Sequence, residues 1–128
     1  MKTLLFIGMG GAIGAILRFS VTELMARLFG KGFPFGILSV NLAGSLLIGV
    51  VFVLIQQGVV GAHSWRPFFV VGMLGALTTF SSFSLDTVLL LEQGHWLKAV
   101  LNVSLNVVCC IIFTYLGMQL TGSLIASR

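Results

Sequence analysis

The sequence predicts an all-α integral membrane protein with four transmembrane helices, and this rests on its composition and its long uncharged stretches. Of the 128 residues, 58% are hydrophobic and 8% are charged, whereas a soluble domain carries roughly 25% charged residues. The mean hydropathy is +1.14. A membrane span needs about 20 mostly apolar residues, and four stretches meet this requirement. We expect one domain with spans at about 3–29, 35–55, 67–91 and 98–121.

The first span contains closely spaced glycines and one internal charge. Gly10 and Gly14 form a small-xxx-small pair, which lets two membrane helices approach closely. They do not form a dinucleotide-binding loop, because Ile13 stands where a GxGxxG motif needs its third glycine. Arg18 lies inside the span and fits two interpretations. Its side chain either extends to the membrane interface or meets a buried structural partner.

Asparagines mark one face of the second span and one face of the fourth. In the second span, which follows the turn at Pro34, Asn41, Ser45 and Gly49 recur four residues apart and share a helix face. The fourth span repeats this spacing in a stripe of Asn102, Asn106, Cys110 and Thr114. A buried amide needs hydrogen-bond partners. Each face therefore either joins helices through hydrogen bonds or lines a polar path for a ligand.

The third span holds the stretch on which the prediction of function depends. Residues 75–84 read GALTTFSSFS, in which five of ten residues are Ser or Thr. At membrane depth, irregular or polar backbone occurs only where it lines a cavity or is buried in protein. We therefore expect the helix to be interrupted between Gly75 and Thr79, forming an ion or substrate site. Asp86 follows one turn after Phe83, and it is either an interfacial or capping carboxylate or a pore residue.

Several function classes do not fit the sequence. The chain has no Ser/His/Asp set, carboxylate pair or metal-ligand cluster, so we do not expect an enzyme. The net charge is +4, but the 7 basic residues are scattered and form no patch for nucleic acid. Cys109 and Cys110 are adjacent, which suits neither a disulfide nor a metal site, so we interpret them as packing residues.

The basic residues are divided almost evenly between the two sides of the membrane. Four spans put both termini on one side, with Lys2, Arg66 and Arg128. Arg27, Lys31 and Lys98 lie on the other side, and Arg18 is ambiguous inside its span, so the division is three against three or four. Orientation follows the asymmetry of Lys and Arg in short loops. The balance indicates either a weak bias overridden by other signals, or a protein that inserts both ways and pairs head-to-tail with itself. A four-helix chain this small also needs a two-fold oligomer to enclose a polar path.

Three motifs occur in order along the chain: GGAIGAILR at 10–18, NLAG at 41–44 and GxxTTFSSFS at 75–84. Together they resemble the Fluc (CrcB) family of fluoride channels, and the resemblance covers the whole chain. It implies a passive fluoride-selective channel, multi-pass in the bacterial inner membrane, that exports toxic fluoride. It also implies an antiparallel, dual-topology homodimer in the lipid bilayer, with a structural Na⁺ at its centre.

The resemblance also implies which residues form the fluoride path. Phe80 and Phe83 are similar to the aromatic residues that line it, and Asn41 is similar to the pore amide of the second helix. The other residues expected along the path are Thr79, Ser81, Ser82, Asn102 and Asn106. The family often carries hydroxyls at the two fourth-helix positions, so the asparagines there are a departure.

The remaining implied roles are structural. The backbone carbonyls of Gly75 and Thr78 match the positions that hold Na⁺ on the two-fold axis. Arg18 matches the first-helix arginine of the family. Asp86 stands where the family pattern leads us to expect Glu, which shortens its reach by one methylene.

The competing function is that of a small multidrug-type exporter, which is also a four-span, dual-topology dimer. Such a protein needs an intramembrane carboxylate on its first helix to couple protons to a cationic drug. Glu23 lies near the end of the first span, between Arg18 and Arg27. The sequence therefore lacks that site, and a fluoride channel is the expected function.

Overall fold

The computed structural model describes residues 1–127, and the regular structure in that range is helical. The elements are α1 (Lys2–Phe29), α2 (Phe35–Gln56), α3 (Ala62–Trp65), η1 (Arg66–Leu74), α4 (Gly75–Leu77), α5 (Phe80–Glu92), α6 (Trp96–Ser104), η2 (Leu105–Cys109) and α7 (Cys110–Ala126). They join into four helical runs that are long and apolar enough to cross a membrane: Lys2–Phe29, Phe35–Gln56, Arg66–Glu92 and Trp96–Ala126. The predicted number of spans is confirmed.

Two boundaries differ from the sequence-based expectation. The fourth run continues to Ala126, beyond the predicted end near residue 121, because helical hydrogen bonding persists after the side chains become more polar. The connection after α2 is shorter than expected, since α3 already begins at Ala62. The segments η1 and η2 are π-helical, a wider winding that the hydrophobic pattern does not reveal.

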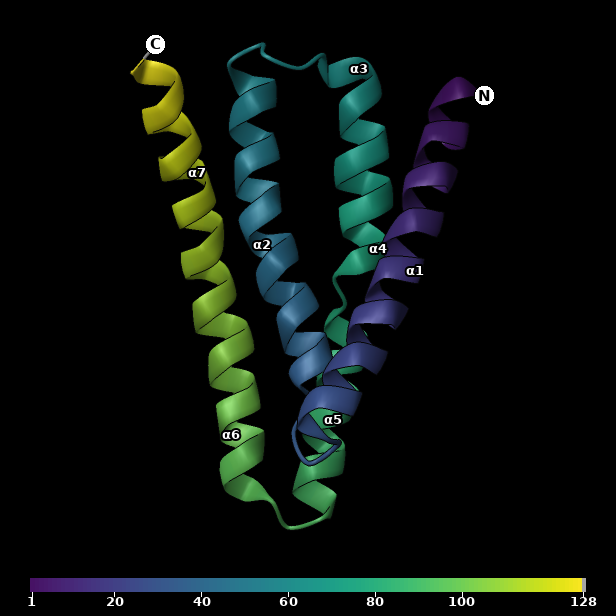
Figure 1. The fold of residues 1–128 in the computed structure, drawn as a ribbon, viewed down its shortest axis with the longest axis vertical. Coiled ribbons are helices and arrows are strands. Elements are labelled where there is room, and N and C mark those ends of the chain that lie inside the picture. The colour runs from purple at the N-terminus through teal and green to yellow at the C-terminus, as the bar shows by residue number, and fades with distance from the viewer. Residues whose placement is uncertain (128) are drawn as a thin grey trace.

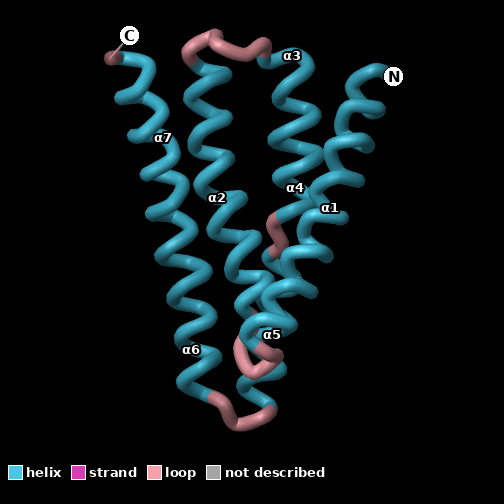
Figure 2. The backbone as a smooth tube through the Cα atoms, in the orientation of Figure 1, coloured by secondary structure: helices cyan, strands magenta, loops and turns pink. Residues whose placement is uncertain are grey.

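The four runs cross the molecule alternately and place both described ends of the chain on the same side (Figure 1). The α2–α3 connection lies at that side, and the two connections at 30–34 and 93–95 lie at the other (Figure 2). Lys2 and Arg66, which begin α1 and η1, therefore belong to the side of the termini. Lys31 and Lys98 belong to the opposite side, where Lys98 Nζ donates a hydrogen bond to the Gly32 carbonyl at 2.9 Å. Arg128 lies outside the described residues.

Glycines bring the helices into close contact. Gly10 and Gly14 on α1 are buried against η1, and an added Cβ would collide with the carbonyl oxygens of Phe68 and Met73, respectively. The predicted small-residue pair is therefore confirmed, and its partner is the third run of the same chain. An equivalent contact joins α2 to α7, where Gly49 and Gly117 each lie against the backbone of the other helix.

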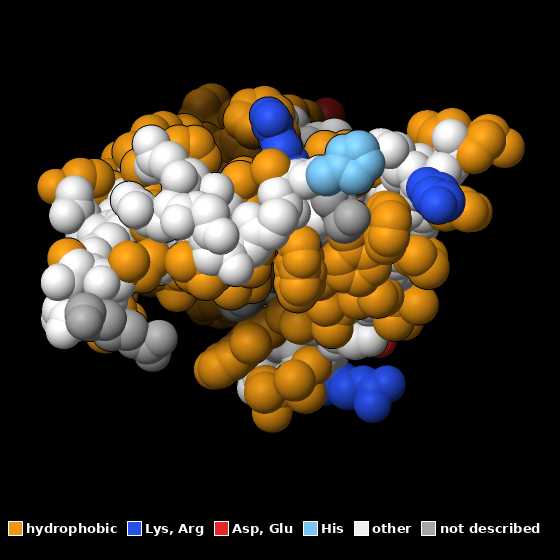
Figure 3. All heavy atoms as spheres, turned by 90° about the horizontal axis from the view of Figure 1, so that it is seen from above, with side chains coloured by type: hydrophobic (Ala, Val, Ile, Leu, Met, Phe, Trp, Pro, Cys, Tyr) orange, Lys and Arg blue, Asp and Glu red, His pale blue; other side chains and the backbone are white. Residues whose placement is uncertain are grey.

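The outside of the bundle is mostly apolar. Large hydrophobic side chains are exposed along all four runs, and Figure 3, which looks onto the end of the bundle, shows many of them around its edge. The buried apolar cluster is small and centres on Val40, Leu74 and Leu77. Water-soluble monomers rarely expose apolar patches of this extent. With four apolar helices of spanning length, the chain is a multi-pass membrane protein.

Candidate functional site

The third run is interrupted at Thr78 and Thr79. Thr78 has φ −81° and ψ 152°, and Thr79 has φ −154° and ψ 118°, so both are extended. Gly75 is still helical, with φ −62° and ψ −34°. The break thus lies at the C-terminal end of the predicted interval of 75–79. Extended backbone suits the β-branched threonines, and the glycine is not the residue that leaves the helix.

Asn41 on α2 gives the Thr79 backbone at the break two hydrogen bonds. Its Oδ1 accepts from the Thr79 backbone N–H at 2.9 Å, and its Nδ2 donates to the Thr79 carbonyl at 3.2 Å. An unpaired backbone group in this environment would cost free energy. The sequence left open whether Asn41 joins helices or faces a ligand. Its amide does join helices, and it also lines a cavity.

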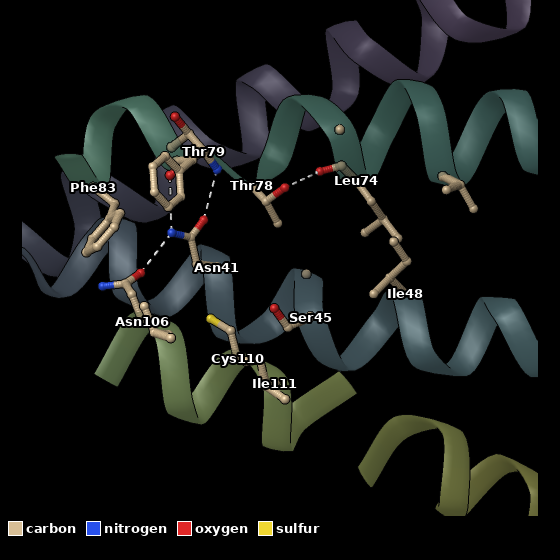
Figure 4. A pocket seen from close by; sticks show the side chains of 15 residues that line it. Asn41, Ser45, Ile48, Leu74, Thr78, Thr79, Phe83, Asn106, Cys110 and Ile111 are labelled. Atoms are coloured by element: carbon tan, nitrogen blue, oxygen red, sulfur yellow. Dashed lines mark hydrogen bonds between the residues drawn. The ribbon is translucent and has the colours of Figure 1, made fainter. Parts of the chain in front are cut away.

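A line of hydrogen bonds continues from Asn41 into the fourth run. Asn41 Nδ2 donates to Asn106 Oδ1 at 2.9 Å, as Figure 4 shows. Asn106 Nδ2 donates to the carbonyl oxygen of Asn102 at 2.9 Å and to its Oδ1 at 3.0 Å. Asn102 Nδ2 then donates to Thr87 Oγ1 at 2.9 Å. The three predicted asparagines are therefore brought together. Thr87 was not predicted, although its position four residues after Phe83 puts it on the same face of α5.

The two predicted phenylalanines also lie in contact. The ring centroids of Phe80 and Phe83 are 5.1 Å apart, with an interplanar angle of 67°, so an edge of one ring meets the face of the other. Phe83 is 6% exposed, whereas Phe80 is 76% exposed. Most of the Phe80 ring is therefore exposed at the surface of the single chain.

The predicted hydroxyl residues cluster at the start of α5. Thr79 is its N-cap, and Thr79 Oγ1 accepts from the Ser82 backbone N–H at 3.2 Å. The same oxygen lies 3.1 Å from Ser81 Oγ and donates to Ser82 Oγ at 3.2 Å. Capping of this kind satisfies one of the unpaired N–H groups of a helix start. Ser81 is exposed and Ser82 is partly buried.

The break, the amides and the aromatic pair surround a cavity of about 430 Å³. Figure 4 shows it between the third run, α2 and the fourth run. Its lining consists of apolar and uncharged polar residues: Asn41, Gly44, Ser45, Ile48, Val70, Leu74, Gly75, Thr78, Thr79, Phe80, Phe83, Asn106, Val107, Cys110 and Ile111. Of the predicted path residues, Ser81, Ser82 and Asn102 are not part of this lining. The cavity wall therefore contains side-chain amides and aromatic rings but no charged side chain.

A second cavity of about 450 Å³ lies toward the 30–34 connection. Ser82 lines it, together with Glu23, Lys31 and Asp86. Asp86 is partly buried there. Arg18 lines neither cavity. It is partly buried, and its carbonyl accepts a hydrogen bond from the Thr22 hydroxyl at 2.7 Å.

The backbone carbonyls of Gly75 and Thr78 fit the role of cation ligands. In an unbroken helix each would accept from the N–H four residues on, those of Thr79 and Ser82. Here the Thr79 N–H donates to Asn41, and the Ser82 N–H donates to the Thr79 hydroxyl. Both carbonyl oxygens thus lose their helical donors. Gly75 is also exposed, and a Cβ added there would come no closer than 3.6 Å to another atom, Val70 O.

Comparison with known proteins places the chain in a family. Residues 5–118 match the family described as CrcB-like protein, Camphor Resistance (CrcB). The chain belongs to the CrcB family. Within this family, the chain is 56% identical over 123 residues to a protein of Aeromonas salmonicida (strain A449) named "Fluoride-specific ion channel FluC", covering 96% of this chain and 98% of that one.

Two further relatives carry the same name. The chain is 52% identical to a Shewanella amazonensis (strain ATCC BAA-1098 / SB2B) protein over 123 residues, covering 96% of this chain and 98% of the relative. It is 51% identical to a protein of Pseudoalteromonas translucida (strain TAC 125) over 114 residues, covering 89% and 95%. The predicted membership of the CrcB family is therefore confirmed.

Proposed function

We propose that this chain is a passive, fluoride-selective ion channel and has no enzymatic activity. The observation that carries the proposal is the uncharged cavity at the break, because amide and aromatic groups converge there in a relative of proteins named as fluoride-specific channels. Phe80 and Phe83 lie edge to face beside Asn41 and Asn106 in the cavity wall. The edge of an aromatic ring is its positive part, so these groups suit a small anion.

The same groups suit rapid passage. A channel must bind its ion strongly enough to admit it and weakly enough to release it. The lining of the cavity contains no Lys or Arg among the described residues, so no fixed positive charge would trap fluoride. The N-terminus of α5 also directs N–H groups toward the break, which favours an anion there.

The working unit in this proposal is an antiparallel homodimer. Phe80 and Gly75, both exposed in the single chain, lie beside the cavity and would be covered by a second copy. The near balance of basic residues between the two sides favours insertion in both orientations. Two chains related by a two-fold axis would then enclose a path that one chain leaves open.

A structural Na⁺ at the dimer centre completes the proposal. Its support is that the Gly75 and Thr78 carbonyls have both lost their helical donors. Backbone oxygens are suitable ligands for a hard monovalent ion, and irregular segments of transporter helices coordinate Na⁺ in this way. Two copies would contribute four such oxygens.

The biological role we propose is the export of toxic fluoride across the inner membrane of a bacterium. The test is fluoride efflux from liposomes that contain the purified protein, measured with a fluoride electrode. We expect rapid fluoride efflux and no matching chloride efflux. Equal rates for both halides would contradict selectivity. Proton-coupled uptake of a cationic dye without fluoride flux would instead support a small multidrug-type exporter, whose required carboxylate would have to be Glu23.

A further inference from the structure

The chain contains only three asparagines, and all three belong to one line of hydrogen bonds. We call this line the amide chain; it consists of Asn41, Asn106, Asn102 and the hydroxyl of Thr87. Thr87 Oγ1 ends it by donating to the carbonyl oxygen of Phe83 at 2.8 Å. Asn41, Asn106 and Asn102 are 9%, 6% and 1% exposed, respectively, so bulk water competes little for their hydrogen bonds.

Every donor of the amide chain points away from Asn41. Both hydrogens of Asn41 Nδ2 are used, one by the Thr79 carbonyl and one by Asn106 Oδ1. Both hydrogens of Asn106 Nδ2 are used as well, by the carbonyl and side-chain oxygens of Asn102. An anion that entered between Asn41 and Asn106 would therefore meet an N–H donor on one side and an oxygen on the other. In this arrangement the pair is a poor anion site.

We propose that fluoride entering between Asn41 and Asn106 reverses the amide chain, so that both amides donate to the ion. This proposal rests on the proposed channel function. Asn41 keeps its orientation, because two backbone groups of Thr79 fix it. The Asn106 amide turns over and directs its N–H group toward the ion. An acceptor in the empty chain thus becomes a second donor when the ion is present.

The reversed chain has replacement partners beyond Asn106. The oxygen of the turned Asn106 faces Asn102, whose amide turns in the same sense and donates to it. Asn102 Oδ1 then faces Thr87, whose hydroxyl hydrogen rotates away from the Phe83 carbonyl. A hydroxyl can make this change because it is both donor and acceptor and its hydrogen rotates freely. Within residues 1–127, Asn102 Nδ2 makes one hydrogen bond, so it also holds an uncommitted hydrogen.

A backbone atom keeps the empty chain in its present direction. The carbonyl oxygen of Asn102 accepts from Asn106 Nδ2, and a turned Asn106 would bring its own oxygen toward that carbonyl. The reversal therefore costs free energy in the absence of an ion. Hydrogen bonds to an ion are roughly twice as strong as those between neutral groups, and two of them offset this cost. Part of the binding free energy is used to turn the amides over, and this limits how tightly the ion is held.

The position of each residue separates contact with the ion from support. Asn41 and Asn106 line the cavity, whereas Asn102 and Thr87 do not. Thr87 is therefore a positioning residue that acts through the two asparagines of the fourth run. Thr121 provides a matched comparison. Its hydroxyl is buried and donates to the Gly117 carbonyl at 2.8 Å, the same helical bond that Thr87 makes, but it bonds no asparagine.

A solid-state NMR experiment on the wild-type protein tests the reversal directly. Protein labelled with ¹⁵N only at asparagine side chains gives three signals, which the Asn102→Ser and Asn106→Ser variants assign. In bilayers with fluoride, we expect equally fast dipolar dephasing by ¹⁹F at the side-chain nitrogens of Asn41 and Asn106, because both then donate directly to the ion. Slower dephasing at Asn106 than at Asn41, or dephasing at neither, in a preparation that conducts fluoride would overturn the proposal.

A second experiment compares the asparagine side-chain ¹⁵N signals of three threonine variants without fluoride. Thr87→Val removes two hydrogen bonds of the empty chain, the one from Asn102 Nδ2 and the one to the Phe83 carbonyl, but only one of the reversed chain. The variant therefore favours the reversed chain, and we expect its Asn106 signal to move toward the fluoride-bound position. Thr87→Ser keeps the hydroxyl and should give the wild-type signal, as should the control Thr121→Val. An Asn106 signal that stays at the wild-type position in Thr87→Val would overturn the proposal.

The two experiments also separate this inference from the proposed function. A wild-type protein that passes no fluoride would remove the channel function itself. A conducting wild type in which ¹⁹F dephases Asn106 more slowly than Asn41 would remove only the reversal. If Thr87→Val does not fold, the NMR result on the wild-type protein decides the question.

Discussion

The side chain of Asn41 forms a two-point hydrogen bond with the backbone of Thr79, at 2.9 Å to its N–H and 3.2 Å to its carbonyl. This contact lets the third run lose its helical hydrogen bonds inside an apolar environment. The two residues are 38 positions apart in sequence. The break in one span is therefore stabilised by a polar residue of another.

Replacing Asn41 by leucine should destabilise the protein. The substitution leaves the Thr79 N–H without a partner, while the Thr79 carbonyl, at the N-cap of α5, keeps only its helical donor. A buried unpaired group costs about 1–3 kcal/mol. We expect a clear drop in the melting temperature measured in detergent. Ser45→Ala is the matched control, because Ser45 lies one turn further along α2 and lines the same cavity. An Asn41→Leu protein as stable as the control would show that the break does not need this contact.

Replacing Phe80 or Phe83 by isoleucine should slow fluoride efflux by about fivefold or more while the protein stays folded. An aliphatic side chain removes the positively polarised ring edge, and the loss of one such contact is worth about 1 kcal/mol or more. The two variants should differ in stability. Phe83 is buried and its loss leaves a cavity, whereas Phe80 is largely exposed.

Phe52→Ile on α2 is the control for this pair, since Phe52 is exposed and lines neither cavity. Efflux should remain at the wild-type rate in this control. If Phe80→Ile and Phe83→Ile match it, the aromatic pair has no part in conduction.

Two lysines added at the C-terminus should bias insertion toward one orientation. The two sides of the membrane carry nearly equal numbers of basic residues, so a small change should shift the orientation. Activity in cells should fall, because an antiparallel dimer needs both orientations. Co-expression of a copy biased the other way should restore it. Orientation is measured by labelling a single cysteine placed in the 57–61 connection of a protein that lacks Cys109 and Cys110. Full activity from a uniformly oriented population would contradict the antiparallel dimer.

The sequence predicted the four spans and the broken third run because both leave local signals. Long, mostly apolar stretches mark the spans, and the dense hydroxyl residues around Phe80 and Phe83 mark the break. The local sequence did not predict the exact position of the break, since that position depends on Asn41, which bonds Thr79 from another helix. For the same reason, Thr87 was not predicted as part of the site.

The asparagines of the fourth run show a second limit of sequence analysis. Their spacing puts Asn102 and Asn106 on one face, but it does not say which other helix that face meets. The contact between Asn102 and Asn106 also depends on how the fourth run winds. Asn106 lies in the π-helical segment η2, and its side chain donates to the carbonyl oxygen of Asn102. Hydrophobic periodicity does not distinguish such a π-helical turn from the surrounding α-helix.

Substitution of Gly75 should separate dimer assembly from the folding of a single chain. A Cβ at this position comes no closer than 3.6 Å to another atom of the chain, so Gly75→Val leaves the protomer room to fold. In the proposed dimer, the branched side chain would crowd the approach of the two copies around Na⁺. We expect Gly75→Val to abolish fluoride flux and to release monomers in cross-linking or size-exclusion experiments.

Gly14→Val is the contrasting variant, because a Cβ there collides with the Met73 carbonyl inside the same chain. It should prevent folding of the protomer itself.

Thr78→Ser should be tolerated, since the proposed Na⁺ ligand is a backbone oxygen. Replacing Na⁺ by a bulky organic cation during purification should weaken the wild-type dimer or stop its flux, with removal of Na⁺ verified by elemental analysis. A dimer that remains stable and conducting after complete exchange would show that carbonyls freed by the break do not require a bound cation.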